Sequence, residues 1–268
     1  MIGPLERAFA VLELLVDEPA GLPLSDISDA LAIPRSATHR LLTSLSELGY
    51  LRQDKAMGNY VLTLKVVSLA LKRLSTIGIV ELAQPTLDQL AELSGELVRL
   101  SIVDDETLMW VAKAQGAKAG LRYDPDTGTK VKLSCSASGQ AWLATFSDDH
   151  ALELVYREGF AKPSDYGPTA PATVAEFLER LHRARDMGYA TINESFEVGT
   201  AAMAAPIMHP TQQQASGVLS IAGPNIRMTE QRMQELVPAL ITAAAELSHL
   251  SLETVHGPRV LAKAQKPA

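Results

Sequence analysis

The chain has 268 residues, of which 47% are hydrophobic and 21% charged, as is typical of a globular protein with one large or two moderate domains. No charge-free stretch is long enough to cross a membrane, no export signal is recognisable, and the single cysteine, Cys135, excludes an internal disulfide, so we expect a cytoplasmic protein. The net charge of −7 argues against a protein that coats nucleic acid without specificity.

The first 48 residues have the pattern of three helices. Apolar residues spaced by three and four predict a helix over 5–16. Its buried stripe is expected to contain Leu5, Phe9, Leu12 and Val16, widened by Ala8, Val11 and Leu15. Ser25 is expected to cap a short helix over 26–31, and after a tight turn a third helix begins at Pro34 and ends before Gly49. The last two helices, joined by this turn, form a predicted helix-turn-helix.

The third predicted helix has two unlike faces. The apolar face carries Leu41, Leu42, Leu45 and Leu48. The other face carries Arg35, Ser36, His39, Arg40 and Thr43. Its first turn lacks the acids that a helix dipole favours, and its basic and hydroxyl side chains suit contact with phosphates and base edges. An ordinary solvated surface is the alternative that this helix alone leaves open.

A predicted hairpin follows the helix-turn-helix. Strand-like runs at 50–54 and 59–62 flank a turn, which makes the hairpin a wing with Arg52 and Lys55 near the phosphate backbone. Residues 35–73 contain seven Lys or Arg and two acids, an excess of five positive charges on an otherwise acidic chain. This distribution is compatible with directed DNA binding.

The remainder predicts an α+β domain with an antiparallel sheet of five or six strands. Strands are expected over residues 97–103, 108–114, 120–123, 189–193, 201–207 and 217–222. Helices are expected over 81–94, up to Phe146, up to Arg157, from Thr173 to Gly188, and from Thr229 onward. The predicted divisions are a winged helix-turn-helix (1–63), a linker helix (64–78), a second domain (79–255) and a basic tail (256–268).

The sequence gives little support for a catalytic nucleophile or a metal site. Cys135 and Ser138 have no histidine at a recognisable spacing, and the six histidines form no pair with metal-ligand spacing. We therefore expect no enzymatic activity, no metal and no cofactor. Two alternatives stay open: a helix-turn-helix protein with an enzymatic domain that uses Cys135 or Ser138, and a DNA-binding protein that responds to no ligand.

The chain resembles the IclR family of bacterial transcription regulators along nearly its whole length. The resemblance is carried by residues 5–8, 33–42, 48–51, 188–206 and 220–224. It implies a winged helix-turn-helix, a linker helix and a C-terminal GAF-like effector-binding domain. It also implies homodimers, often paired into tetramers, that bind double-stranded operator DNA of two-fold symmetry and a small-molecule effector.

The resemblance also implies site residues. The DNA-facing part of the recognition helix would carry Arg35, Ser36, Thr38, His39 and Arg40. The effector pocket would be lined by Tyr123, Ala137, Ser138, Gly139, Ile192, Thr200, Ala202, Ser220 and Ala222. Residues 137–139 would offer backbone N–H groups to a carboxylate at a helix N-terminus.

The implied pocket is more apolar than is usual in the family. Ile192 stands where the family often has an acid, Ala202 where it often has a cysteine, and Ala222 where it often has a serine. We therefore expect a carboxylate effector with an apolar or aromatic body, and not a two- or three-carbon keto acid. The alternatives are that these differences are neutral packing changes or that the pocket has degenerated.

Overall fold

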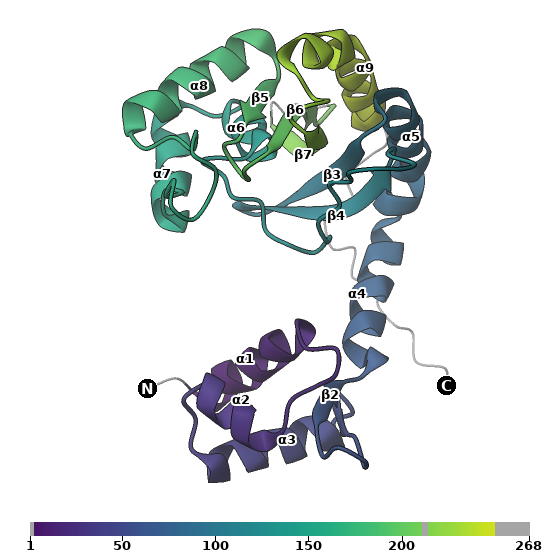
Figure 1. The fold of residues 1–268 in the computed structure, drawn as a ribbon, viewed down its shortest axis with the longest axis vertical. Helices are drawn as coiled ribbons and strands as arrows, with labels where there is room; N and C mark the ends of the chain where they lie inside the picture. The colour runs from purple at the N-terminus through teal and green to yellow at the C-terminus, as the bar shows by residue number, and fades with distance from the viewer. Residues whose placement is uncertain (1–2, 211–213, 250–268) are drawn as a thin grey trace, which may run out of the picture. The chain divides into compact units, whose positions relative to one another are not determined.

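A computed structural model describes residues 3–210 and 214–249, with the backbone alone for 73–77, and the chain divides into two compact units, Met1–Thr76 and Ile77–Ala268 (Figure 1). The predicted basic tail, 256–268, lies outside the described residues. The linker helix α4 (Leu64–Ile77) is almost entirely part of the first unit. No helix among the described residues has the length and apolar character needed to span a bilayer.

The first unit is a winged helix-turn-helix, as predicted. It consists of α1 (Pro4–Val16), α2 (Leu24–Ala30), α3 (Arg35–Glu47), β1 (Leu51–Gln53), β2 (Tyr60–Leu62) and α4. The two strands pair antiparallel, and Arg52 lies opposite Val61. The core of this unit is formed by Val11, Leu15, Ile27, Leu42, Leu45, Leu51 and Tyr60.

The predicted buried face of α1 is correct only in part. Leu5, Phe9 and Val16 are 71%, 57% and 63% exposed, whereas Val11 and Leu15 are buried. Both sets have helical spacing, so the pattern could not choose between them; α1 buries the set that meets α3 and β2. An apolar stripe of α1 is thereby left on the surface.

Three smaller predictions about the first unit also need correction. Pro23, and not Ser25, is the N-cap of α2, because the helix begins at Leu24; the Ser25 hydroxyl, within the first turn, donates to the Asp26 carboxylate. Pro34 is the N-cap of α3 and not its first helical residue. Leu48 is 58% exposed, because α3 ends at Glu47.

The second unit contains a five-stranded antiparallel sheet within the described residues. Its strands, in spatial order, are β4 (Thr107–Gln115), β3 (Leu97–Asp104), β7 (Ala215–Pro224), β6 (Thr200–Met208) and β5 (Ala190–Asn193). The strand predicted over 120–123 does not form. Gly120 has a φ of +80°, and the Tyr123 carbonyl accepts a hydrogen bond from the Gln115 side chain instead of pairing with a strand.

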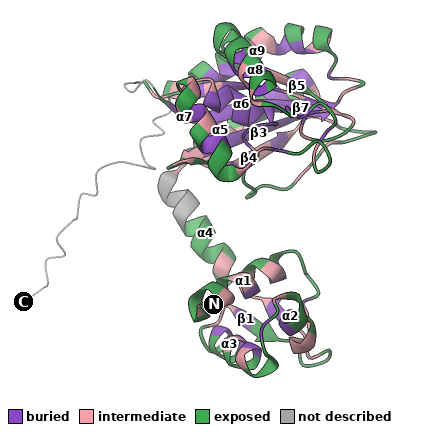
Figure 2. Ribbon diagram, turned by 90° about the vertical axis from the view of Figure 1, so that its left-hand side faces the viewer, coloured by how far each residue is buried: buried purple, intermediate pink, exposed green. Residues whose placement is uncertain are grey.

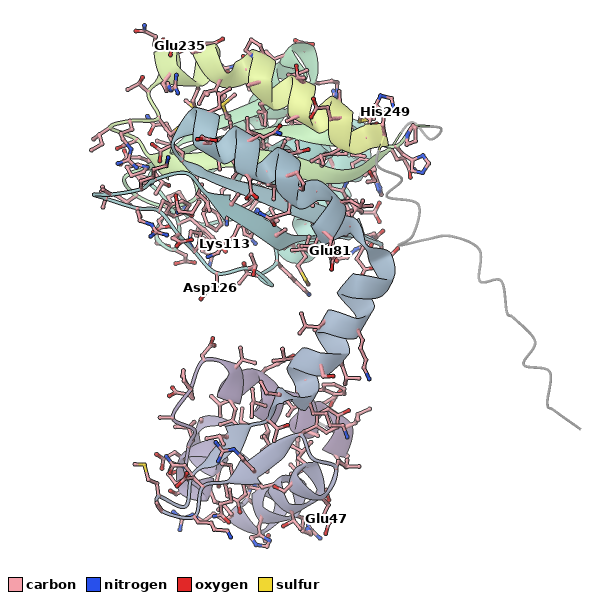
Figure 3. All side chains as sticks on the ribbon, turned by 90° about the vertical axis from the view of Figure 1, so that its right-hand side faces the viewer. Glu47, Glu81, Lys113, Asp126, Glu235 and His249 are labelled. Carbon is pink, nitrogen blue, oxygen red and sulfur yellow. The ribbon has the colours of Figure 1, made fainter. Side chains whose placement is uncertain are left out.

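Helices cover both faces of the sheet. On one face, α5 (Ile79–Ser94) and α9 (Glu230–His249) lie side by side, and Figure 3 labels Glu81 on α5 and Glu235 on α9. The core on the other face contains residues of α6 (Ala137–Leu143), α7 (Asp148–Glu158) and α8 (Val174–Met187). Figure 2 shows the buried sheet between these layers.

A bulge in β4 decides which side chains share the α6 side of the sheet. Leu100 pairs with Ala112 and Ser101 pairs with Trp110, so Val111 is an extra residue in β4. Trp110 consequently packs in the core on the α6 side, whereas Ala112 packs in the core beneath α5 and α9. The bulge brings Trp110 next to Arg99 of β3, with the Arg99 Cζ 3.8 Å from the ring centroid.

Candidate functional site

The turn between α2 and α3 is fixed by hydrogen bonds. The Ser28 hydroxyl donates to the Ile33 carbonyl at 2.7 Å, and the Ile33 N–H donates to the Ser28 carbonyl at 3.0 Å. Ala32 adopts a φ of +50°, a left-handed conformation that residues other than glycine rarely adopt and that reverses the chain here. The direction of α3 relative to α2 is therefore set within six residues.

The exposed face of α3 carries most of the predicted DNA-contacting residues. Arg35, Ser36, His39 and Arg40 are exposed, and no ion pair among the described residues involves either arginine. Because neither guanidinium group is held in an ion pair with a described residue, each can bind guanine bidentately or contact a phosphate. Figure 3 labels Glu47, the acid at the far end of this helix.

Thr38 is a correction to the predicted DNA-contacting set. Its side chain is fully buried, and its hydroxyl lies 3.3 Å from the Ile33 carbonyl oxygen and 3.2 Å from that of Pro34. A side chain with no exposed surface cannot contact DNA. Thr38 lies one turn into the helix, beside four exposed polar residues. The sequence pattern therefore could not distinguish this buried residue from its exposed neighbours.

We expect Thr38→Val to destabilise the first unit by about 0.5–2 kcal/mol, because the valine keeps the shape but loses the hydroxyl's hydrogen bonds. Chemical denaturation measures this loss, and the base preference of the variant for operator DNA should be unchanged. Ser36→Ala is the matched comparison: this exposed residue should leave stability unchanged. An altered base preference for Thr38→Val at unchanged stability would contradict the structural role.

The wing residues Arg52 and Lys55 are both exposed. The Asp54 carboxylate accepts hydrogen bonds from the backbone N–H groups of Met57 and Ala56, which lowers the pKa of this group and fixes the turn. Lys65 donates to the Leu48 carbonyl at 2.5 Å. This bond ties the start of α4 to the end of α3.

Sequence reasoning did not single out Arg7 as part of the basic surface. A groove of about 630 Å³ lies between α1 and α3, and Arg7 and Arg40 both line it. The sequence shows that Arg7 is a basic residue of α1. It does not show that Arg7 lies near α3, because that depends on how the two helices pack.

A small cavity lies between the sheet and the start of α6. It is lined by Arg99, Trp110, Tyr123, Ser136, Ala137, Ser138, Ile192, Phe196, Thr200, Ala202, Ser220 and Ala222. Its accessible volume is about 20 Å³, far below the usual range for small-molecule sites, about 300–1,000 Å³. The cavity is narrow, so a ring-sized ligand requires the surrounding side chains to move.

Eight of the nine predicted effector residues line this one cavity. Gly139 does not. A Cβ at Gly139 would lie 2.4 Å from the Leu133 carbonyl oxygen, so glycine is needed here for close packing of α6. The Gly139 N–H already donates to the Ser136 hydroxyl at 3.0 Å, so it is not free to receive a carboxylate.

Four lining residues were missed: Arg99, Trp110, Ser136 and Phe196. Arg99 did leave a signal, since it is the one charged residue within the apolar run 97–103, and a strand covered on both faces rarely contains a charge. Trp110 and Phe196 could not be placed from the sequence, because the β4 bulge and the β5–β6 loop bring them there. Their rings meet edge to face, with centroids 5.8 Å apart.

Burial dominates the electrostatics of the cavity. Arg99 is 5% exposed, and burial lowers the pKa of its guanidinium, while the nearby Tyr123 and Glu197 act in the opposite direction. Burial raises the pKa of Tyr123 to about 12, so its phenol is neutral. Glu197 is exposed. Arg99 is therefore the charged group within the lining.

The candidate nucleophiles are unsuited to catalysis. Burial raises the pKa of Cys135 to about 12, which keeps the thiol protonated. The structure pairs neither Cys135 nor Ser138 with a histidine over the ranges it describes. In those same ranges, no three His, Cys, Asp or Glu residues are arranged to hold a metal ion.

Comparison with known families matches both units. Residues 4–55 match the IclR helix-turn-helix domain, and residues 71–249 match the family described as bacterial transcriptional regulator IclR C-terminal.

Individual members of this family are also similar to the chain. The chain is 26% identical to the transcriptional repressor IclR of Escherichia coli K12, over 92% of this chain and 89% of that protein. It is 30% identical to the HTH-type transcriptional regulator BhcR of Paracoccus denitrificans, over 92% of this chain and 86% of that protein. The fold is similar to that of an IclR homolog from Microbacterium hydrocarbonoxydans crystallised with 4-hydroxybenzoate, with a TM-score of 0.75 at 20% identity over 93% of this chain and all of that one.

Proposed function

Because the chain belongs to the IclR family of bacterial transcriptional regulators, we propose that it binds operator DNA as a homodimer and responds to a small carboxylate with an apolar or aromatic body. Arg35, Ser36, His39 and Arg40 contact the operator in the major groove, and Arg52 and Lys55 contact its backbone. The cavity beside α6 holds the effector. The relatives named above are regulators, and this chain is a regulator rather than an enzyme.

The observation that carries the effector proposal is the composition of the cavity wall. Ile192, Ala202 and Ala222 face the cavity where a keto acid would need hydrogen-bonding partners. Burying an unmatched ligand hydroxyl or carbonyl there costs about 1–3 kcal/mol per group. Trp110 and Phe196 offer aromatic surface to a flat apolar body.

We expect calorimetric titration to give dissociation constants for benzoate, phenylacetate or 4-hydroxybenzoate at least tenfold lower than those for pyruvate and glyoxylate. The reason is that aromatic acids bury apolar area against Trp110 and Phe196, whereas the keto acids leave polar groups unpaired. Tight binding of pyruvate or glyoxylate, with none of the aromatic acids binding, would overturn the proposed effector class.

The homodimer is supported by apolar residues left on the surface of the first unit. On α1 they are Leu5, Phe9 and Val16, and on α4 they are Leu64, Val67 and Leu71. Each set has helical spacing and lies along one side of its helix (α4 is largely exposed in Figure 2). A second copy of the same chain is the occupant we propose, because an operator of two-fold symmetry needs two recognition helices related by the same symmetry.

A further inference from the structure

Two hydrogen-bond donors that line the cavity have no partner among the described residues. The Nε of Arg99 and the indole Nε1 of Trp110 are both buried without a hydrogen bond, and both residues line the cavity. Neither group can accept a hydrogen bond, so each can be satisfied only by an acceptor. Buried donors without a partner are uncommon in folded proteins and call for a specific explanation.

The positive charge of Arg99 is also not paired with an acid among the described residues, and its hydrogen-bonding neighbour is the neutral phenol of Tyr123. The Arg99 side chain is 5% exposed, and no ion pair in the described parts of the chain includes it. The carboxylate of Glu197 acts on it electrostatically but belongs to an exposed loop residue and forms no ion pair with it. By contrast Glu96, a buried acid of the same unit, binds Arg227 through both carboxylate oxygens, at 2.6 and 2.9 Å.

The stacking of Arg99 on Trp110 does not replace an anion. The guanidinium lies with its Cζ 3.8 Å from the centroid of the indole and 5.8 Å from that of the Tyr123 ring. Stacking holds the guanidinium plane in place and leaves its N–H groups directed along the edges of that plane, where a carboxylate can accept them. The stacking therefore fixes the position of the guanidinium but does not neutralise its charge.

Part of the start of α6 is already engaged in hydrogen bonds. Gly139, which would donate from the first turn, already donates to Ser136, and α6 is only seven residues long. The hydroxyls of Thr200 and Ser220 donate to the backbone carbonyls of Glu197 and Arg99. The Nε of Arg99 and the Nε1 of Trp110 are the lining side-chain donors that still lack an acceptor among the described residues.

We propose that Arg99 binds the carboxylate of the effector, while Trp110 holds the guanidinium in place and the ligand's apolar body lies toward Ile192 and Phe196. This inference rests on the proposed function of the cavity. It places the anion at the β3–β4 side of the cavity, and not at the N–H of Gly139, which already donates to Ser136.

The test uses the full-length chain, four probes and two variants. Calorimetry compares benzoate and phenylacetate with their neutral amides, benzamide and phenylacetamide. The variants are Arg99→Gln and, as a matched control, Arg183→Gln, which removes an exposed arginine of α8 that lies outside the cavity lining. We expect the wild type and Arg183→Gln to bind the carboxylates more tightly than the amides. Arg99→Gln should lose about 10- to 100-fold in carboxylate affinity and little in amide affinity.

A second readout separates ligand binding from a structural role. The melting temperature of ligand-free Arg99→Gln should equal or exceed that of the wild type, because the substitution removes an unpaired buried charge. If Arg99 mainly supported the fold, this temperature would fall. Should the variant fail to fold, Arg99→Lys, which keeps the charge but not the planar group, should retain an intermediate preference for carboxylates over amides.

The possible failures are distinguishable. If the wild type binds the carboxylates and Arg99→Gln binds them equally well, Arg99 is not the anion partner, but the proposed effector class stands. If the wild type binds none of the carboxylates, or binds the amides as tightly, the proposed effector class fails and the role of Arg99 fails with it.

Discussion

Replacing Arg35 and Arg40 together by alanine should abolish specific operator binding and leave effector binding intact. Both side chains are exposed on α3, and neither is held in an ion pair in the part of the chain that the structure describes. A good bidentate arginine–guanine pair contributes about 1–3 kcal/mol of discrimination. Loss of both guanidinium groups should therefore weaken specific binding by roughly 30- to 20,000-fold.

Electrophoretic mobility shift with specific and scrambled duplexes at one fixed salt concentration measures this effect. Salt must be fixed because phosphate contacts make affinity depend steeply on it. The control is Arg183→Ala with Arg232→Ala, which removes two arginines from the second unit and should leave operator binding within about twofold. Unchanged specific affinity in the Arg35→Ala, Arg40→Ala variant would refute the role of α3.

Replacing Leu5 and Phe9 together by aspartate should convert the proposed homodimer to a monomer. The two residues are 71% and 57% exposed, so the substitution adds charge to the proposed dimer surface without entering the core. A monomer contacts only one half of a two-fold operator, and losing the second linked contact should weaken binding by about 10²- to 10⁴-fold.

Sedimentation velocity reports the oligomeric state, and mobility shift reports the operator affinity of the same samples. Leu93→Asp with Ile226→Asp is the matched control, because these residues are 55% and 75% exposed in the second unit. A Leu5→Asp, Phe9→Asp variant that remains dimeric at micromolar concentration would show that this side of α1 does not form the interface.

Helix and strand boundaries were predictable where short-range chemistry sets them. Gly95 and Gly188 end α5 and α8 in the left-handed conformation that glycine allows, and the side chain of Thr173 caps α8. Period-two alternation located β3 and β4 to within one residue at each end. These features depend on residues within one turn of each other, so they can be predicted from the sequence.

The failures arose where the partner of a side chain lies far along the chain. Two stripes on α1 fit the helical period, and contact with α3 and β2 decided that Val11 and Leu15 would be buried. Thr38 shares the polar character of its neighbours but faces inward to the carbonyls of Ile33 and Pro34. Residues 120–123 are apolar enough for a strand, but no strand edge pairs with them.

The order of residues by itself determined the two-unit organisation, the winged helix-turn-helix and the basic surface of α3, because capping, periodicity and charge are local properties. Most of the cavity lining was predicted only from the resemblance to the IclR family. Only the tertiary structure placed Arg99 against Trp110, because that contact depends on the β4 bulge and on strand pairing. The same folding that buried this arginine left it without an acid. The sequence shows that residue 99 is an arginine, but only its burial beside Trp110 in the folded chain makes it a candidate ligand contact.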